Sequence, residues 1–281
     1  MRGLVEYAML GRRQAIIIVL LCGFFPLLYF FSAAIVALVT LRRGHNEGLI
    51  VLLWSMLPAG TLWAMGDSSP TFLMLGTFAL AVVLRKTGSW QYAVLAAMAV
   101  GLVTQLSLMF QPAYLAQVES LVSGGLQEQL NQSGGTQYTA QQIVDLLMSF
   151  YGANHAIMVI VCLMIARWGQ AALYNPGGFR QEFHNLRFDP RVMIALMALI
   201  LAALLDIPPF ELWLPLFSVG PMIAGLSIAH YTVAKKGGGV AWLVMVYMTL
   251  LMMAPAVIML GLADSVLDLR KRLDNSGKPG A

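Results

Sequence analysis

Long apolar stretches separated by short polar turns run through most of the chain. A helix needs about 20 apolar residues to cross the hydrocarbon core of a bilayer, so such stretches are typical of transmembrane helices. The pattern predicts an all-α fold, a polytopic transmembrane helical bundle with about eight apolar runs. The runs cover residues 14–41, 48–66, 70–84, 89–110, 150–166, 192–205, 210–233 and 240–263.

Composition points to the same class of protein. Hydrophobic residues make up 59% of the chain and charged residues 11%, whereas a soluble domain carries about 45–50% and about 25%. The mean hydropathy is +0.76. This balance leaves too little polar surface for a water-soluble enzyme. It predicts a single membrane domain over residues 1–281, with the lipid bilayer as its main surroundings.

The basic residues are confined to short segments. The 17 Lys and Arg residues lie in a few clusters, which the positive-inside rule assigns to the cytoplasm. The clusters are Arg2, Arg12 and Arg13; Arg42 and Arg43; Arg85 and Lys86; Arg167, Arg180, Arg187 and Arg191; Lys235 and Lys236; and Arg270, Lys271, Arg272 and Lys278. The other connections carry only acidic residues and are expected on the opposite side. The N-terminus is therefore predicted to be cytoplasmic.

Two runs with a proline near the middle have basic residues at both ends. The 14–41 run contains Pro26, and only an even number of crossings leaves the basic residues at both of its ends on one side. We therefore predict a short Pro-broken hairpin over residues 14–41. Residues 240–267 contain Pro255 and are also flanked by basic residues, which predicts a second hairpin and a cytoplasmic C-terminus. The alternative is a single helix over residues 240–263 that places the tail outside.

Two longer polar segments interrupt the runs. Residues 111–149 contain no Lys or Arg and include amphipathic stretches at 114–122 and 139–150, so they are predicted to form an extracytoplasmic cap. Residues 168–191 contain a turn at Asn175-Pro176-Gly177-Gly178 and a mixed-charge segment. They are predicted to form a cytoplasmic loop.

Polar side chains near the predicted outer ends of the runs are candidates for binding, because polar groups in a membrane are costly. Asn154 and His155 lie one turn inside a helix end next to Tyr151, and nearby carboxylates would supply charge selectivity. The predicted substrate-binding residues are Trp63, Asp67, Tyr151, Asn154, His155, Asp206, Glu211 and Trp213. The alternative is a ring of interfacial aromatic and turn residues that never meet.

The last apolar run ends in closely spaced acidic and basic residues. Asp264 and Asp268 lie one helical turn apart, and Asp268 precedes Arg272 by four residues, the favourable order for an ion pair. We predict that this segment forms a cytoplasmic lock in which Asp264 contacts another segment, with the basic turns at 85–86 and 235–236 on the same side. The lock residues are Asp264, Asp268, Arg270 and Arg272. The alternative is an ordinary solvated helix end.

The sequence carries no signal for catalysis. Cys22 and Cys162 lie in apolar runs without metal-ligand spacing, and neither a phosphate-binding loop nor a nucleophile with its base is recognisable. We predict no enzyme activity, no metal, no cofactor and no nucleic-acid partner. Ala93, Ala97 and Gly101 recur at four-residue intervals. This spacing favours a helix-packing face over a groove for a partner protein.

Three stretches carry a family resemblance. They are the Gly-Leu-Ser-Ile-Ala-His-Tyr segment at 225–231, the segment at 261–273, and the N-terminal double run that closes on Arg42-Arg43-Gly44-His45. Together they resemble the YybS-like family of bacterial inner-membrane proteins. The resemblance implies a fold like that of the S-components of energy-coupling-factor transporters, which capture small molecules from the outer face and dock to partner proteins inside.

Two further features bear on this resemblance. Ala33 and Ala37 are similar to the small-residue pairs that S-components offer to their transmembrane partner. The cap at 111–149, by contrast, is long for an S-component, and no vitamin-specific loop is recognisable.

The sequence therefore predicts a bacterial inner-membrane protein that binds a small solute at its outer face and assists its transport, together with partner proteins. The alternative is a structural or regulatory membrane protein. In that case the segments 168–191 and 270–281 would recruit cytoplasmic partners.

Overall fold

The computed structural model describes residues 2–25, 28–126, 128, 129, 132 and 139–275. Within these residues all regular elements are helices, as predicted. The first six are α1 (Arg2–Leu10), α2 (Arg12–Gly23), α3 (Tyr29–Arg43), α4 (His45–Ala64), α5 (Ser69–Thr87) and α6 (Trp90–Ser107). Next come η1 (Leu108–Phe110), α7 (Pro112–Leu121), η2 (Val122–Leu126), α9 (Ala140–Tyr174) and α10 (Gly178–His184). The last are α11 (Pro190–Leu204), η3 (Phe210–Trp213), α12 (Leu214–Lys235), α13 (Val240–Met252), α14 (Ala254–Leu267) and α15 (Leu269–Asn275).

Five helical segments are long and apolar enough to cross a membrane, or six if the bent pair α13–α14 counts as one span. The five are His45–Ala64, Ser69–Thr87, Trp90–Phe110, Ala140–Tyr174 and Phe210–Lys235. The predicted all-helical apolar architecture is therefore confirmed. The number of crossings is not confirmed, because about eight runs give five or six helical segments of sufficient length. The remaining runs give shorter helices. The 15-residue α11 spans only about 22 Å at about 1.5 Å per residue.

The 14–41 run is divided into two helices that fold back on each other. The Ser32 hydroxyl in α3 donates a hydrogen bond to the Val19 carbonyl in α2, at 3.0 Å. Arg43 donates to the Met9 carbonyl at 2.6 Å, so the two ends of the hairpin lie at the same end of the bundle. The predicted break is confirmed, although Pro26 itself lies outside the described residues.

The run over residues 240–267 is also broken. Helices α13 and α14 meet at Met253 with a bend of 109°. Pro255 lies in the first turn of α14, where its missing N–H is not needed. The side chains of Lys235 and Tyr231 both bond Asp274, so the chain returns to the end of α12 that carries Lys235. One straight helix over this run is therefore wrong.

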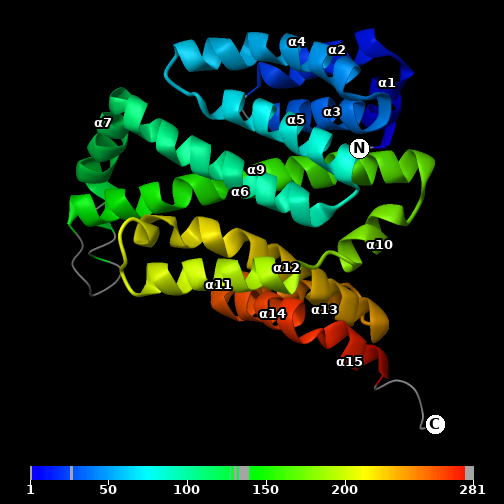
Figure 1. Ribbon diagram of the computed structural model, residues 1–281. Coiled ribbons are helices and arrows are strands. Elements are labelled where there is room, and N and C mark those ends of the chain that lie inside the picture. The colour runs from blue at the N-terminus through cyan, green and yellow to red at the C-terminus, as the bar shows by residue number, and fades with distance from the viewer. Residues whose placement is uncertain (1, 26–27, 127, 130–131, 133–138, 276–281) are drawn as a thin grey trace.

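Helix α9 lies in the middle of the bundle (Figure 1) and contacts α3, α5, α6 and α12. Its contact with α6 uses the predicted small-residue face. Ala93 and Ala97 are buried, and a side chain at Gly101 would overlap the Gly152 carbonyl of α9. Because small residues let the two backbones approach closely, this face packs within the chain.

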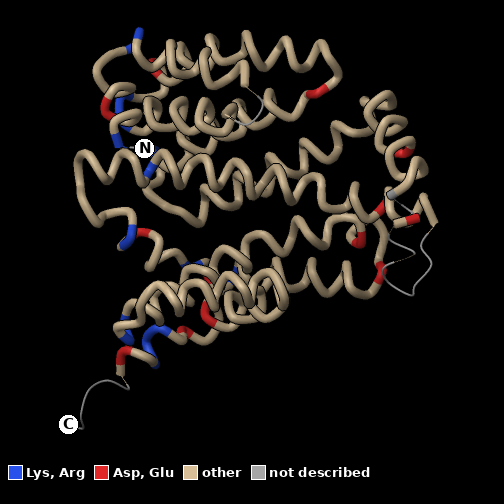
Figure 2. The backbone as a smooth tube through the Cα atoms, turned by 180° about the vertical axis from the view of Figure 1, so that it is seen from behind, with Lys and Arg blue, Asp and Glu red and all other residues tan. Residues whose placement is uncertain are grey.

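Figure 2 shows that Lys and Arg gather at one end of the bundle, whereas the opposite end carries only Asp and Glu among the described residues. Both ends of the N-terminal hairpin are basic, and Arg12 donates to Glu47 there at 2.9 Å. The charge segregation along the sequence is thus a segregation in space. We call the two ends the basic end and the acidic end.

The two polar segments are more regular than predicted. Residues 140–149 continue into the long α9, whose first turn is capped by Thr139 and Gln142. Residues 127, 130–131 and 133–138 of the predicted cap lie outside the described residues. At the other end, residues 168–191 form the end of α9, then α10, then a connection in which Leu186 and Phe188 are buried. The predicted cytoplasmic loop is therefore partly helical and is anchored to the core by Leu186 and Phe188.

Candidate functional site

The predicted outer residues separate into two groups. Tyr151 and His155 are buried on one face of α9, with their rings 4.6 Å apart. His155 Nδ1 donates to the Tyr151 carbonyl at 3.0 Å. The Tyr151 hydroxyl lies 3.5 Å from the hydroxyl of Ser69, and the exposed carboxylate of Asp67 accepts the backbone N–H of Ser69 at 2.9 Å. Tyr151, His155 and the Asp67 turn thus lie together at the acidic end.

The other predicted residues have different surroundings. Asn154, Asp206 and Glu211 are exposed. Trp213 packs against Phe217 with perpendicular rings, their centroids 6.2 Å apart. Trp63 is exposed beside Phe72, and no described contact joins these side chains to His155. The reason is that equal depth along different helices does not determine which side of each helix a residue occupies. A shared binding role for the eight residues stays a prediction.

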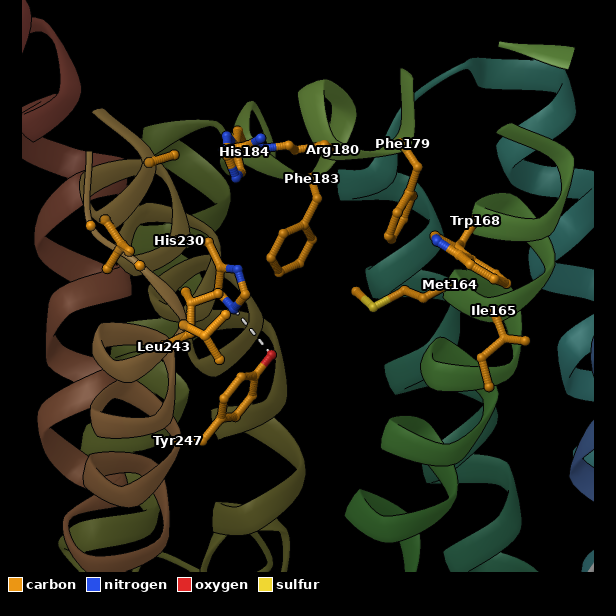
Figure 3. A pocket seen from close by; sticks show the side chains of 15 residues that line it. Met164, Ile165, Trp168, Phe179, Arg180, Phe183, His184, His230, Leu243 and Tyr247 are labelled. Carbon is orange, nitrogen blue, oxygen red and sulfur yellow. Dashed lines mark hydrogen bonds between the residues drawn. The ribbon is translucent and has the colours of Figure 1, made fainter. Parts of the chain in front are cut away.

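A large cleft lies at the basic end, between α9 and α10 on one side and α12 and α13 on the other (Figure 3). Its volume is about 780 Å³, within the range of about 300–1,000 Å³ that is usual for small-molecule sites. None of the eight predicted outer residues lines it. The cleft is therefore a second candidate site, distinct from the predicted one.

The walls of the cleft are mostly apolar. Met164 and Trp168 come from α9, and Leu243 comes from α13. Phe179 and Phe183 project from α10 with stacked rings whose centroids are 6.2 Å apart. Figure 3 shows these side chains converging on the same space from facing helices. Such walls suit an apolar group.

A few polar side chains interrupt this surface. His230 Nε2 and the Tyr247 hydroxyl share a hydrogen bond of 3.0 Å between α12 and α13. The His230 ring also meets the edge of Phe183, with centroids 5.3 Å apart. Arg180 and His184 lie together on α10 at the top of the cleft in Figure 3. The described lining contains no Asp or Glu.

The rim of the cleft is electropositive. Burial lowers the pKa of His184, and the nearby Arg180, His230 and Arg270 lower it further. His184 is therefore neutral at pH 7. Arg180 is exposed and makes no hydrogen bond or ion pair with the described residues. It is a cation free to bind a ligand at the mouth of the cleft.

Helix α10 is held in place from one side by Glu182. Arg167 of α9 donates to Glu182 at 2.9 Å, and Trp90 of α6 donates to it at 3.2 Å. Burial alone would raise the pKa of Glu182, but these hydrogen bonds outweigh burial and hold the pKa below its ordinary value. The wall of the cleft is thereby fixed to two neighbouring helices.

The predicted lock residues hold α10 from the other side. Asp264 is fully buried and accepts from Arg270 Nε at 2.9 Å. Arg270 also donates to the His184 carbonyl, to the Leu186 carbonyl at 2.8 Å and to the Ser227 hydroxyl at 3.0 Å. Burial lowers the pKa of the Arg270 guanidinium, which the Asp264 carboxylate opposes. This cluster joins α14 and α15 to α12 and to the end of α10.

Two details of the predicted lock are wrong. Asp264 contacts Arg270 of its own C-terminal segment rather than the basic turns at 85–86 or 235–236. Asp268 pairs with Arg187 at 2.6 Å instead of Arg272, which is exposed. The reason is that Asp268 adopts a left-handed conformation with φ 52° and ends α14. Residues 268 and 272 therefore do not share one continuous helix.

Sequence reasoning missed most of the cleft. Arg180 and His184 fall in the predicted cytoplasmic loop, and neither His230 nor Tyr247 is among the predicted binding residues. The available signal was the Phe179-Arg180 and Phe183-His184 spacing, which repeats an apolar–basic pair one helical turn later. Among the described residues, no three His, Cys, Asp or Glu side chains form a group that could hold a metal ion.

Comparison of the chain with protein-family models, curated proteins and solved structures finds no match. The resemblance to the YybS-like family stays a prediction.

Proposed function

We propose that this chain is an integral membrane protein that binds a small amphipathic molecule in the cleft at its basic end. The observation that carries the proposal is the cleft itself, about 780 Å³ of space between α9–α10 and α12–α13 with apolar walls and a few polar groups. Sites of this composition bind small molecules, because the apolar walls supply affinity and the polar groups supply orientation.

The charge distribution supports an orientation for this site. Lys and Arg are retained on the cytoplasmic side of membrane proteins, so the basic end is taken as cytoplasmic. The cleft then opens on the cytoplasmic half of the bilayer. Helix α13, which forms one of its walls, has no buried residue and a nearly continuous apolar surface. That helix suits contact with lipid, so an amphipathic molecule would have access to the cleft from the bilayer.

This proposal keeps the predicted class, a non-enzymatic protein that binds a small molecule and assists its passage with partner proteins, and moves the site to the opposite end. The alternative, recruitment of cytoplasmic proteins by residues 168–191 and 270–281, has less support. Leu186 and Phe188 are buried in the core, and Arg270 binds the end of α10, so these residues are engaged within the chain. Residues 276–281 lie outside the described residues.

A variant that fills the cleft tests the proposal. Leu243→Trp adds a large side chain to the wall on α13, and Val244→Trp adds the same side chain next to it, at a residue that is exposed and outside the cleft. Molecules that copurify with each protein in mild detergent would be identified by mass spectrometry. We expect Leu243→Trp to lose the bound molecule and the Val244→Trp control to keep it. The two variants should have equal thermal stability. Identical bound molecules in the wild type and both variants would contradict the proposal.

A further inference from the structure

We propose that the cleft selects an anionic amphiphile, with Arg180 binding a phosphate or carboxylate headgroup and the hydrocarbon chain lying against α10 and α13. This inference rests on the proposed function, since it requires the cleft to be the binding site. The proposed function requires only a cleft of suitable shape, whereas this inference specifies the chemical class of the ligand.

The first argument is charge complementarity. Arg180 contributes the only full charge to the described lining, and no Asp or Glu lies opposite it. The carboxylates on adjoining elements are already bonded, Asp264 to Arg270 and Asp274 to Lys235 and Tyr231. An arginine guanidinium binds phosphate and carboxylate groups through paired hydrogen bonds, and here no carboxylate of the described lining competes for it.

The second argument is the position of two histidines near this arginine. His184 lies beside Arg180 on α10, and His230 lies further into the cleft on α12 with its ring directed towards Tyr247 (Figure 3). A neutral imidazole donates one hydrogen bond, so the His184 ring can orient an anion bound to Arg180 without adding a net charge. The His230 ring is oriented by its 3.0 Å hydrogen bond to Tyr247. The headgroup end of the cleft is thus formed by Arg180 and His184 of α10, with His230 of α12 below them.

The third argument is the apolar space below this end. The rings of Phe179 and Phe183 and the side chains of Met164 and Leu243 line it from three helices. An anion without a hydrocarbon chain would leave this surface unfilled. Basic pockets between helices on the cytoplasmic side are typical sites for anionic lipid headgroups, and a Lys or Arg near an anionic membrane surface contributes about a five-fold gain in affinity. The same chemistry is shared by an anionic phospholipid and by a free fatty carboxylate.

The test uses the full-length protein in a neutral detergent and native mass spectrometry. Four probes are added separately: phosphatidylglycerol, phosphatidylcholine with the same acyl chains, myristate and inorganic phosphate. We expect the wild type to retain phosphatidylglycerol or myristate at least about five-fold better than phosphatidylcholine. Retention of phosphatidylglycerol identifies the bilayer lipid as the source, and retention of myristate alone identifies a free amphiphile. Inorganic phosphate should not be retained.

Two variants assign the headgroup contact. Arg180→Gln should reduce the preference for the anionic probe about five-fold. Arg191→Gln removes the same charge from an exposed residue at the basic end outside the cleft and should leave the preference unchanged.

The outcomes separate the two proposals. An unchanged preference in Arg180→Gln, together with loss of the bound molecule in Leu243→Trp, would overturn the headgroup assignment and leave the cleft as the binding site. Equal retention of all probes by the wild type and Leu243→Trp would overturn both proposals. Retention of inorganic phosphate as strongly as of phosphatidylglycerol would show a site for a free anion and contradict the amphiphile.

Discussion

The apolar runs 14–41 and 240–267 have similar length and both carry a central proline, but their halves pack differently. In the first run, α3 is buried over most of its length between α2, α4, α5 and α9. In the second run, α13 has no buried residue, and only α14 joins the core through α12. A central proline does not by itself break a helix, since Pro58 lies inside α4 and Pro221 inside α12. Where the helix does break, the proline does not determine how the two halves pack.

Side-chain size explains the difference. Helix α3 carries Ser32, Ala33, Ala34 and Ala37 on its buried surface, so neighbouring helices can approach from several sides. Helix α13 carries bulky, exposed residues such as Trp242, Met245 and Leu251. Helix α14 resembles α3 in this respect, because a side chain at Gly261 would overlap the Pro221 carbonyl of α12. The half with small residues enters the core, and the half with large residues forms the surface.

The largest expected effect is in the second run, which depends on a buried ion pair. Asp264→Asn leaves the Arg270 guanidinium, which is only 11% exposed, without its counter-charge. We expect a loss of about 3–5 kcal/mol in the free energy of unfolding, the usual cost of breaking a buried pair. Thermal or denaturant unfolding in detergent measures it.

Two controls accompany this measurement. Asp268→Asn breaks the Arg187 pair, whose partners are solvent-accessible, and should have a much smaller effect because water already screens that pair. Asp264→Leu combined with Arg270→Met replaces both charges by apolar groups and should recover part of the loss. Equal losses for Asp264→Asn and Asp268→Asn would contradict the assigned role of the buried pair.

The next effect compares packing in the two runs directly. Ala37→Leu adds volume to the fully buried face of α3, so we expect a loss of about 1–3 kcal/mol from overpacking. Ala241→Leu makes the same addition at an exposed residue of α13 and should change stability by less than about 0.5 kcal/mol. The same unfolding measurement checks both. A loss as large in α13 as in α3 would show that α13 is packed against the bundle.

A smaller effect is expected at the hydrogen bond that closes the first hairpin. Ser32→Ala removes the donor to the Val19 carbonyl and should cost about 0.5–1.5 kcal/mol. The cost is modest because the Val19 carbonyl lies within α2 and the packing of α3 remains. If Ser32→Ala costs as much as Asp264→Asn, both runs depend on a single polar contact and the contrast between them disappears.

The smallest effect is a pH dependence confined to the C-terminal region. Arg180, His230, Tyr231 and Arg270 surround His184, whose pKa lies below the ordinary value of 6.5 in the folded chain. The unfolded chain therefore binds a proton more readily than the folded chain, and stability falls as the pH decreases below about 6.5. His184→Gln should remove this part of the pH dependence. Parallel stability–pH profiles for the wild type and His184→Gln would rule it out.

The features that the sequence predicted well are those that depend on neighbouring residues. The break within residues 14–41, the break before Pro255 and the packing face at Ala93, Ala97 and Gly101 were all predicted from spacing within single runs. The segregation of basic residues also needed only their order along the chain, because helices that alternate in direction place every second connection at the same end.

The candidate site could not be predicted in the same way. His155 and Glu211 lie at similar predicted depths, but the depth of a residue does not determine which neighbour its side chain faces. The cleft joins residues 164–184 to residues 230–247, and its α10 wall comes from a segment that composition alone assigns to a loop. Two apolar side chains of that segment, Leu186 and Phe188, are buried in the core, and the Phe188 ring lies next to Gly220 of α12.

The sequence by itself determined the helical class, the apolar runs, the positions of the breaks and the charge of each end. These properties follow from backbone hydrogen bonding and from the cost of placing polar groups in an apolar phase, and both act over a few residues. The tertiary structure alone decided that Asp264 pairs with Arg270, that Arg270 holds α10, and that a cleft forms beside Arg180. These contacts join helices distant in sequence, and which faces meet depends on the packing of side-chain volumes over the whole bundle.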